Sequence, residues 1–181
     1  MSERRTITLD DLGLPTALPM PKRKDVGIGL VGVGGIAAAH VANYDAAGLN
    51  IVAAADISPA ARKRAESEYK IGTTYEKVAE LLADERVEVV DLLTQPSVRE
   101  EVVLAAVDAG KPIITEKPLT QDLAEGERMV VSAEAAGVPF AVHQNYRWMT
   151  MNFLASRLVQ KGLIGEPFFA GIEIYLSLIH I

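Results

Sequence analysis

A short glycine-rich segment, VGIGLVGVGGIAAAH (residues 26–40), constrains the fold of this chain more than any other feature. Val26 to Val31 is a short run of mainly branched apolar residues, typical of a buried strand, and Gly34 to Ala47 is alanine-rich and long enough for a helix. Between them, Gly32 permits a tight turn, Gly34 permits close backbone approach, and Ala37 takes the position that packs helix on strand. The segment therefore predicts a strand–loop–helix unit of the kind that binds a dinucleotide.

The loop itself is the expected phosphate site. A helix N-terminus presents free N–H groups and the positive end of a dipole, and both favour a pyrophosphate. We expect five loop residues to lie against it: Gly32, Val33, Gly34, Gly35 and Ile36. Glycine-rich turns are common, so the alternative is a strand–turn–helix with a structural role only.

Asp56 favours the dinucleotide hypothesis. It follows a second expected strand and stands 24 positions after Gly32, close to the spacing of about 20 that dinucleotide-binding folds show. A carboxylate there accepts hydrogen bonds from the ribose diol and repels a 2′-phosphate, which favours NAD over NADP. Arg62 and Lys63 are near enough in sequence to weaken this preference, so NADP stays open. In the alternative, Asp56 is an ordinary loop carboxylate.

The chain continues with regular alternation of strand and helix patterns. The further expected strands are Asn50–Ala55, Val87–Leu93, Pro112–Thr115 and Val138–Val142. The expected helices are Pro59–Tyr69 (with Ser58 as N-cap), Tyr75–Ala83, Ser97–Ala109 and Thr120–Ala136. Such alternation predicts an α/β fold, a doubly wound parallel sheet of Rossmann type.

The two ends of the chain differ from this pattern. Residues 1–24 have three prolines and no sustained period, so we expect a tail that is poorly ordered or lies along the surface. After the alternating region at 25–148, the sequence predicts a helix at Met149–Lys161 and one long strand at Glu166–Ser177 with one solvent-exposed face. One strand cannot make a sheet. Residues 149–181 are therefore expected to be the start of a C-terminally truncated α+β domain.

Composition excludes several classes of function. The net charge of −6 gives no reason to expect a nucleic-acid or anionic-membrane partner, and no apolar run is long enough to span a membrane. The chain has no cysteine, which excludes disulfides and thiolate metal sites, and we predict no metal centre. With no secretory signal pattern near the N-terminus, the default expectation is a cytoplasmic protein.

Three further stretches, together with the glycine loop, carry a family resemblance. They are Thr94-Gln95-Pro96, Thr115-Glu116-Lys117-Pro118-Leu119 and Asn145-Tyr146-Arg147-Trp148. In order and spacing, the region from about Asp25 to Tyr175 resembles the Gfo/Idh/MocA family of NAD(P)-dependent oxidoreductases, which includes glucose-fructose oxidoreductase and inositol dehydrogenases. The resemblance implies a Rossmann domain at 25–148 and, at 149–181, the beginning of a substrate and oligomerisation domain.

The resemblance also implies roles for residues at the ends of later strands. Thr94, Gln95 and Pro96 would lie against the cofactor, and Glu116 and Lys117 would lie near the nicotinamide, where open α/β sheets bind ligands. Lys117 would contact the substrate hydroxyl whose carbon loses the hydride, and would share in moving its proton. An ammonium suits this role because it stabilises a developing alkoxide. The alternative is an exposed loop pair of little consequence.

The segment after the last expected strand is implied to face the substrate. Asn145, Arg147 and Trp148 suit a polyhydroxylated ligand, because amide and guanidinium groups bind hydroxyls and an indole packs on a sugar face. A domain-linking segment anchored by Trp148 is an equal alternative, and His143 is ambiguous in the same way. We expect His40 to be a packed or capping residue rather than a catalytic one.

Departures from the family pattern are limited in the first half of the chain. Many members have proline or asparagine where Gln95 stands and histidine where Arg99 stands, and we expect Arg99 to open a helix. The larger departure is length, because the aspartate and histidine that the second domain normally supplies have no counterpart here. His180 is not assigned that role.

The leading hypothesis is an oxidoreductase that transfers a hydride between a hydroxyl-bearing carbon of a sugar or cyclitol and NAD(P). One alternative is a dinucleotide-binding fragment without turnover, and another is the NAD-dependent glycosidase branch of the same family. We expect a small polyhydroxylated substrate and, for the full-length parent, a homo-oligomer.

Overall fold

The computed structural model describes Thr8, Gly13 and residues 20–171, and every structural statement below concerns these residues. Contacts divide the chain into two compact units: Pro21–His143, and a second unit that contains residues 144–171. No helix in the described part of the chain combines the length and apolar character needed to cross a membrane.

The first unit is built on one six-stranded sheet whose paired strands all run parallel. Its order is β3-β2-β1-β4-β5-β6, the strand order of a Rossmann fold. The strands are β1 (Gly27–Val31), β2 (Asn50–Ala55), β3 (Thr74–Tyr75), β4 (Val89–Leu92), β5 (Ile113–Thr115) and β6 (Phe140–Val142). The helices are α1 (Ala37–Ala47), α2 (Pro59–Ser67), α3 (Val78–Ala83), η1 (Pro96–Val98), α4 (Arg99–Asp108) and α5 (Leu123–Ala136). The predicted fold class is confirmed.

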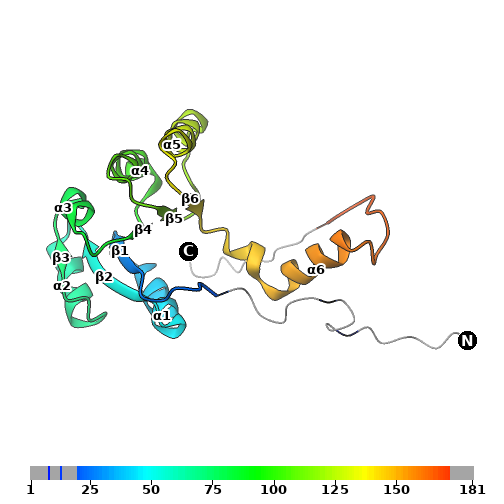
Figure 1. The fold of residues 1–181 in the computed structure, drawn as a ribbon, viewed down its shortest axis with the longest axis horizontal. Coiled ribbons are helices and arrows are strands. Elements are labelled where there is room, and N and C mark those ends of the chain that lie inside the picture. The colour runs from blue at the N-terminus through cyan, green and yellow to red at the C-terminus, as the bar shows by residue number, and fades with distance from the viewer. Residues whose placement is uncertain (1–7, 9–12, 14–19, 172–181) are drawn as a thin grey trace, which may run out of the picture. The chain divides into compact units, whose positions relative to one another are not determined.

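Helices cover both faces of this sheet, as Figure 1 shows. One core cluster packs α3, α4 and α5 on the sheet through residues such as Leu81, Val103 and Met129. The other packs α1 and α2 on the opposite face through residues such as Val41 and Ala65. Because both faces are covered, the central strands are buried on each side, which explains their near-continuous apolar sequences.

Most predicted elements form, and the differences lie at their ends. Ser58 caps α2, since its hydroxyl accepts a hydrogen bond from the Ala61 N–H (3.3 Å). The expected helix start at Tyr75 is wrong, because residues 74–75 pair with β2 as the edge strand β3 and the helix begins only at Val78. Pairing with a neighbouring strand thus overrides the helical pattern there.

In the second unit, η2 (Asn145–Trp148) precedes α6 (Thr150–Gln160), which agrees with the helix expected at 149–161. The strand expected at Glu166–Ser177 is not formed over residues 166–171. A strand needs a hydrogen-bonded neighbour, and the described residues offer none to this stretch. Residues 172–177 of that prediction lie outside the described residues.

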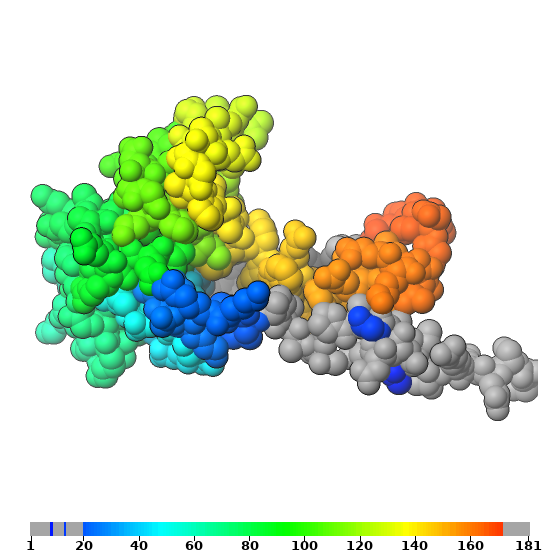
Figure 2. Space-filling view, viewed as in Figure 1, coloured from blue at the N-terminus to red at the C-terminus, as the bar shows by residue number. Residues whose placement is uncertain are grey.

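The residues just before β1 lie at the surface of the first unit, where Figure 2 shows them in blue. The Arg23 guanidinium donates to Asp25 (2.9 Å) and to Glu88 (2.5 Å), which precedes β4. Arg23 therefore links this segment to the residue that precedes β4. The rest of the expected tail lies almost entirely outside the described residues.

Candidate functional site

The carboxyl edge of the sheet gathers most of the residues that the sequence singles out. β1 and β4 are neighbours, but the chain continues from β1 towards β2 and from β4 towards β5, in opposite directions along the sheet. The edge between two such strands is the topological switch point at which open α/β sheets bind ligands. The loops that follow β1, β4 and β5 all lie at this edge.

The glycine loop is held close to the loop after β4. Gly32 has a φ of +89°, and a Cβ at this position would lie 3.2 Å from the Leu93 carbonyl carbon and 3.3 Å from the Thr94 nitrogen. Only glycine meets both conditions without strain. Gly34 and Gly35 are exposed, and a Cβ on either would have no neighbour within 4 Å. The N-terminus of α1 has no side-chain cap at Ile36, so this backbone is accessible to a ligand.

Asp56 ties the glycine loop to the end of β2. Its Oδ2 accepts from the Val33 N–H (2.7 Å), and its Oδ1 accepts from the Ser58 N–H (2.8 Å). Each carboxylate oxygen has a second lone pair for a further donor. Arg62 donates to the Asp56 carbonyl (2.8 Å) and lies 3.5 Å from Glu76, so its charge is partly engaged. Arg64, which sequence reasoning missed, donates to the Val33 carbonyl from α2.

The loop after β4 contains Thr94, Gln95 and Pro96, as predicted. Gln95 is exposed, and Pro96 begins the short helix η1. The Thr94 Oγ1 is buried and has no hydrogen-bond partner among the described residues. An unpaired buried hydroxyl is costly, and it is the kind of group that a bound ligand satisfies.

Arg99 begins α4, as expected, but its side chain is only 1% exposed. The guanidinium donates to the carbonyls of Thr94, Pro118 and Leu119. It therefore links the loop after β4 to the loop after β5, a role that its position in the sequence does not reveal. Burial lowers the pKa of Arg99, and the charge of Glu116 opposes that effect.

The loop after β5 carries Glu116 and Lys117, followed by a cis peptide bond to Pro118. The Glu116 Oε2 accepts from the Lys117 N–H (3.1 Å), and Glu116 Oε1 lies 3.2 Å from the His40 Nε2. Lys117 is exposed, and its ammonium makes no hydrogen bond or ion pair with any described residue. It is therefore available to a ligand at this edge.

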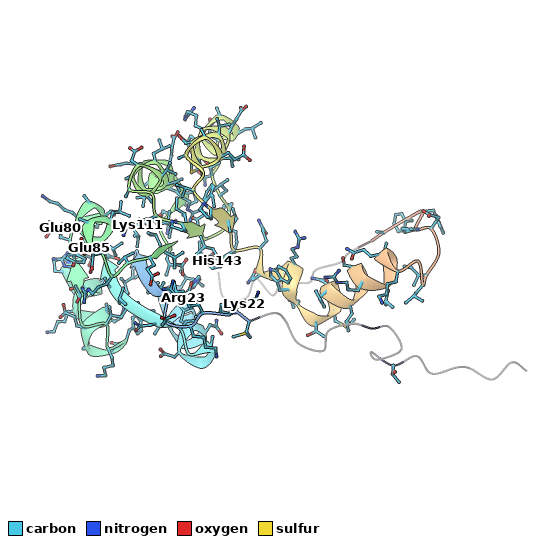
Figure 3. All side chains as sticks on the ribbon, in the orientation of Figure 1. Lys22, Arg23, Glu80, Glu85, Lys111 and His143 are labelled. Atoms are coloured by element: carbon cyan, nitrogen blue, oxygen red, sulfur yellow. The ribbon has the colours of Figure 1, made fainter. Side chains whose placement is uncertain are left out.

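A buried carboxylate in β4, Asp91, joins this loop to α1 and to the end of β6. Asp91 is fully buried. It lies 2.8 Å from the His40 Nδ1 and 2.9 Å from the Nε2 of His143, which Figure 3 labels, and it accepts from the Tyr44 hydroxyl (2.8 Å). The two imidazole rings meet edge to face at 4.8 Å. His40 is thus packed, as expected, but it is not a cap.

The pKa values of this cluster follow from its contacts. Burial alone raises the pKa of Asp91, but hydrogen bonds from His143 and His40 and their charges hold that pKa below its usual value. Burial alone lowers the pKa of His40, but hydrogen bonds with Asp91 and Glu116 and their charges raise it above its usual value. Burial and the Asp91 charge raise the pKa of Tyr44.

His40, Asp91 and His143 are also residues of metal-binding type, and their ligand atoms lie within 4.8 Å of one another. Both Asp91 oxygens, however, are already at hydrogen-bond distance from ring nitrogens. Hydrogen bonding therefore accounts for the cluster.

Sequence reasoning did not identify Asp91. A charged residue inside an apolar strand, VVDLL, is the one signal that could have found it, because such a residue is buried and needs partners.

The expected substrate residues Asn145, Arg147 and Trp148 lie in η2, in the second unit. All three are exposed. The Arg147 guanidinium lies 5.7 Å from the centre of the Trp148 ring, and that ring lies 6.4 Å from Phe153. Their proposed contact with a substrate stays a prediction.

Comparison with known proteins gives a consistent result. Residues 26–144 match the model of the oxidoreductase family with an NAD-binding Rossmann fold. The chain is 32% identical over 145 residues to a D-apiose dehydrogenase of Paraburkholderia graminis, covering 80% of this chain and 39% of that protein. It is 31% identical over 153 residues to an inositol 2-dehydrogenase of Azotobacter vinelandii, covering 78% of this chain and 43% of that protein. The chain thus spans about two fifths of the length of these relatives.

Solved structures are similar over the same part. An oxidoreductase from Agrobacterium radiobacter, solved in complex with NAD+, L-tartaric acid and magnesium, superposes with a TM-score of 0.76 at 30% identity, over 80% of this chain and 42% of that one. An NAD-binding oxidoreductase from Klebsiella pneumoniae has a TM-score of 0.74 at 30% identity, over 78% and 40% of the two chains. The resemblance predicted from four motifs is confirmed: this chain belongs to the Gfo/Idh/MocA family of oxidoreductases and carries its NAD-binding Rossmann fold.

Proposed function

We propose that this chain is the cofactor-binding part of an enzyme that transfers a hydride between a hydroxyl-bearing carbon of a sugar or cyclitol and NAD(P). The observation that carries the proposal is the convergence of three loops, after β1, β4 and β5, at the switch point of the sheet. Because the chain spans about two fifths of its relatives' length, turnover is proposed for the whole protein. Cofactor binding is proposed for the chain itself.

The residues at this edge fit a dinucleotide. The open backbone of Gly34 and Gly35 and the uncapped N-terminus of α1 suit a pyrophosphate, which needs N–H donors and close approach. The remaining hydrogen-bonding capacity of Asp56 suits a ribose diol and disfavours a 2′-phosphate, so NAD is the preferred cofactor and NADP the weaker one. The buried Thr94 hydroxyl has no partner in the described part of the chain, which suits a ligand beside the loop of Thr94, Gln95 and Pro96.

When bound, the nicotinamide supplies the hydride chemistry, and the protein supplies position and charge. In the proposal, Gly32, Val33 and Ile36 hold the phosphate loop in shape, and Glu116 and Lys117 border the reacting end. Lys117 donates a hydrogen bond to the substrate oxygen and shares in moving its proton during oxidation. Its ammonium is free for this because no described residue engages it.

The proposed substrate class is supported by the names of the relatives and by the residues after β6. Two relatives are named as a D-apiose dehydrogenase and an inositol 2-dehydrogenase. In the proposal, Asn145 and Arg147 bind hydroxyl groups and Trp148 packs on an apolar ring face of such a polyol. We also propose that residues 25–148 form the dinucleotide-binding domain and that a substrate domain begins at residue 149. The full-length protein is proposed to be a homo-oligomer.

Isothermal titration of the chain with NAD+ and with NADP+ tests the cofactor part directly. We expect saturable binding with NAD+ tighter than NADP+. Absence of binding of both at millimolar concentration would contradict the proposal. In the full-length protein, Lys117→Ala should reduce turnover of polyols far more than cofactor affinity. An equal loss in both would contradict the proposed place of Lys117 at the reacting end of the cofactor.

A further inference from the structure

The hydrogen bonds around Asp91 require a proton on each histidine nitrogen that faces it. The proposed hydride transfer does not explain this requirement. Asp91 is fully buried, and its pKa lies below the usual value, so it is ionised near neutral pH and only accepts hydrogen bonds. Each ring nitrogen that faces it must therefore carry a proton. This assigns an N–H to the His40 Nδ1 at 2.8 Å and to the His143 Nε2 at 2.9 Å.

The second nitrogen of His40 faces another carboxylate. Its Nε2 lies 3.2 Å from the Glu116 Oε1. A neutral imidazole with its proton on Nδ1 would present a lone pair to that oxygen, which is repulsive. Both contacts are favourable together only when His40 carries a proton on each nitrogen. The His40 ring is 11% exposed and the Glu116 side chain 16% exposed. Water therefore screens the charges of Asp91, His40 and Glu116 only weakly.

Glu116 connects His40 to the next residue in the sequence, Lys117. While Oε1 faces His40, Oε2 accepts the backbone N–H of Lys117 at 3.1 Å. A continuous chain of hydrogen bonds thus runs from the buried Asp91 through His40 and Glu116 to the Lys117 backbone. The participating residues are far apart in sequence but meet where β4, the first turn of α1 and the loop after β5 come together.

We propose that His40 acts as an imidazolium and positions Lys117, holding the Glu116 carboxylate between its ring and the Lys117 amide. The functional meaning of this inference rests on the role proposed for Lys117, but the proton and the linkage do not. His40 is a positioning residue in this scheme, since it reaches the site only through Glu116. Loss of its proton from Nε2 removes the bond to Glu116 Oε1 and leaves the Glu116 carboxylate, with its bond to the Lys117 amide, without an anchor.

The groups that face His40 support this charge state. Asp91 from β4 and Glu116 from the loop after β5 are both anionic partners, and the Tyr44 hydroxyl of α1 donates to the same Asp91 oxygen. His143 meets the ring edge to face. Arg99, from α4, is close enough for its charge to interact with Glu116. One imidazolium between two carboxylates is the arrangement that leaves the fewest buried acceptors facing one another.

Nuclear magnetic resonance of the chain without cofactor tests the inference. Imidazole nitrogen shifts should show His40 protonated on both nitrogens at pH 6.5. The Lys117 amide proton should then shift with pH in one step at the midpoint of the His40 ring. In His40→Gln, which retains hydrogen-bonding capacity but cannot titrate, that step should vanish. His143→Gln is the matched control, because His143 also contacts Asp91 but not Glu116, and the step should persist.

A neutral His40 at pH 6.5, a Lys117 amide that does not follow the His40 midpoint, or a step that survives in His40→Gln would each overturn the inference. The wild-type titration is informative even if a variant folds poorly. This readout is also separate from cofactor binding: a chain that fails to bind NAD+ but shows the coupled step refutes only the proposed function, and the reverse result refutes only the role of His40.

Discussion

The two sides of the carboxyl edge are built in different ways. On the β1–β2 side, the glycine loop offers exposed backbone. Asp56, which follows β2, accepts hydrogen bonds from Val33, 23 positions before it, and from Ser58, two positions after it. On the β4–β6 side, Asp91 is fully buried and contacts residues 47 to 52 positions away. The first side is shaped by backbone geometry, and the second by buried charges that must be paired. Removal of a buried charge on the second side should therefore lower stability, and changes to the exposed backbone on the first side should act mainly on binding.

Removal of the buried carboxylate should have the largest effect. Asp91→Ala leaves His40, His143 and the Tyr44 hydroxyl without their common acceptor, and we expect it to lower the free energy of unfolding by about 3 kcal/mol. Urea unfolding at pH 7 measures this. Asp45→Ala on the exposed side of α1 is the matched control and should change stability by less than about 0.5 kcal/mol. Similar losses in both variants would contradict the importance of the buried network.

Two glycines of one loop should separate stability from binding. Gly32→Ala places a side chain at a φ of +89° and 3.2 Å from the Leu93 carbonyl carbon, so we expect a loss of about 2 kcal/mol in unfolding free energy. Gly34→Ala meets no atom within 4 Å and should leave stability unchanged while it weakens NAD+ binding, because its methyl group occupies the proposed pyrophosphate approach. Unfolding curves and titration calorimetry give the two quantities. If Gly34→Ala binds NAD+ with wild-type affinity, the pyrophosphate does not bind at this loop and the proposed phosphate site is wrong.

The same contrast explains which parts of the molecule could be predicted from sequence. The glycine loop, Asp56 and the alternating elements are visible because their meaning depends on local spacing and period. The ends of these elements depend on tertiary contacts as well: residues 74–75 form a strand only because β2 is there to pair with. The strand expected at 166–171 shows the same dependence, since its apolar residues have no described strand beside them.

The buried network could not be read from the sequence, because its members come from four different elements. His40 lies within a helix, Asp91 within a strand, and Glu116 and His143 follow two other strands. Each residue alone has an ordinary interpretation. Arg99 is similar, since its helix-opening position was predictable but its three carbonyl partners were not. Only the strand order brings these side chains together.

A smaller effect, specific to the β1–β2 side, is expected from Asp56→Asn. The amide oxygen still accepts from one backbone N–H, but the charge that suits a ribose diol is lost. NAD+ affinity should fall about tenfold, or about 1.4 kcal/mol, while NADP+ affinity should fall less. Glu76→Gln, which removes a nearby carboxylate without contact to the glycine loop, should affect neither cofactor. An equal loss for NAD+ and NADP+ in Asp56→Asn would refute the proposed ribose contact.

The smallest effect, and the one specific to the β4–β6 side, is a pH dependence of stability. Because the folded-state pKa of His40 is raised, its contribution is fully present below the unfolded-state pKa of about 6.5 and is lost as pH rises through the folded-state value. Wild type should therefore exceed His40→Gln in unfolding free energy by about 1 kcal/mol more at pH 6 than at pH 9. Urea unfolding of both proteins at the two pH values measures this difference. If the gap between them is the same at pH 6 and pH 9, the imidazolium does not stabilise this side of the edge, and the buried Asp91 carboxylate is held there by neutral imidazole and hydroxyl donors alone.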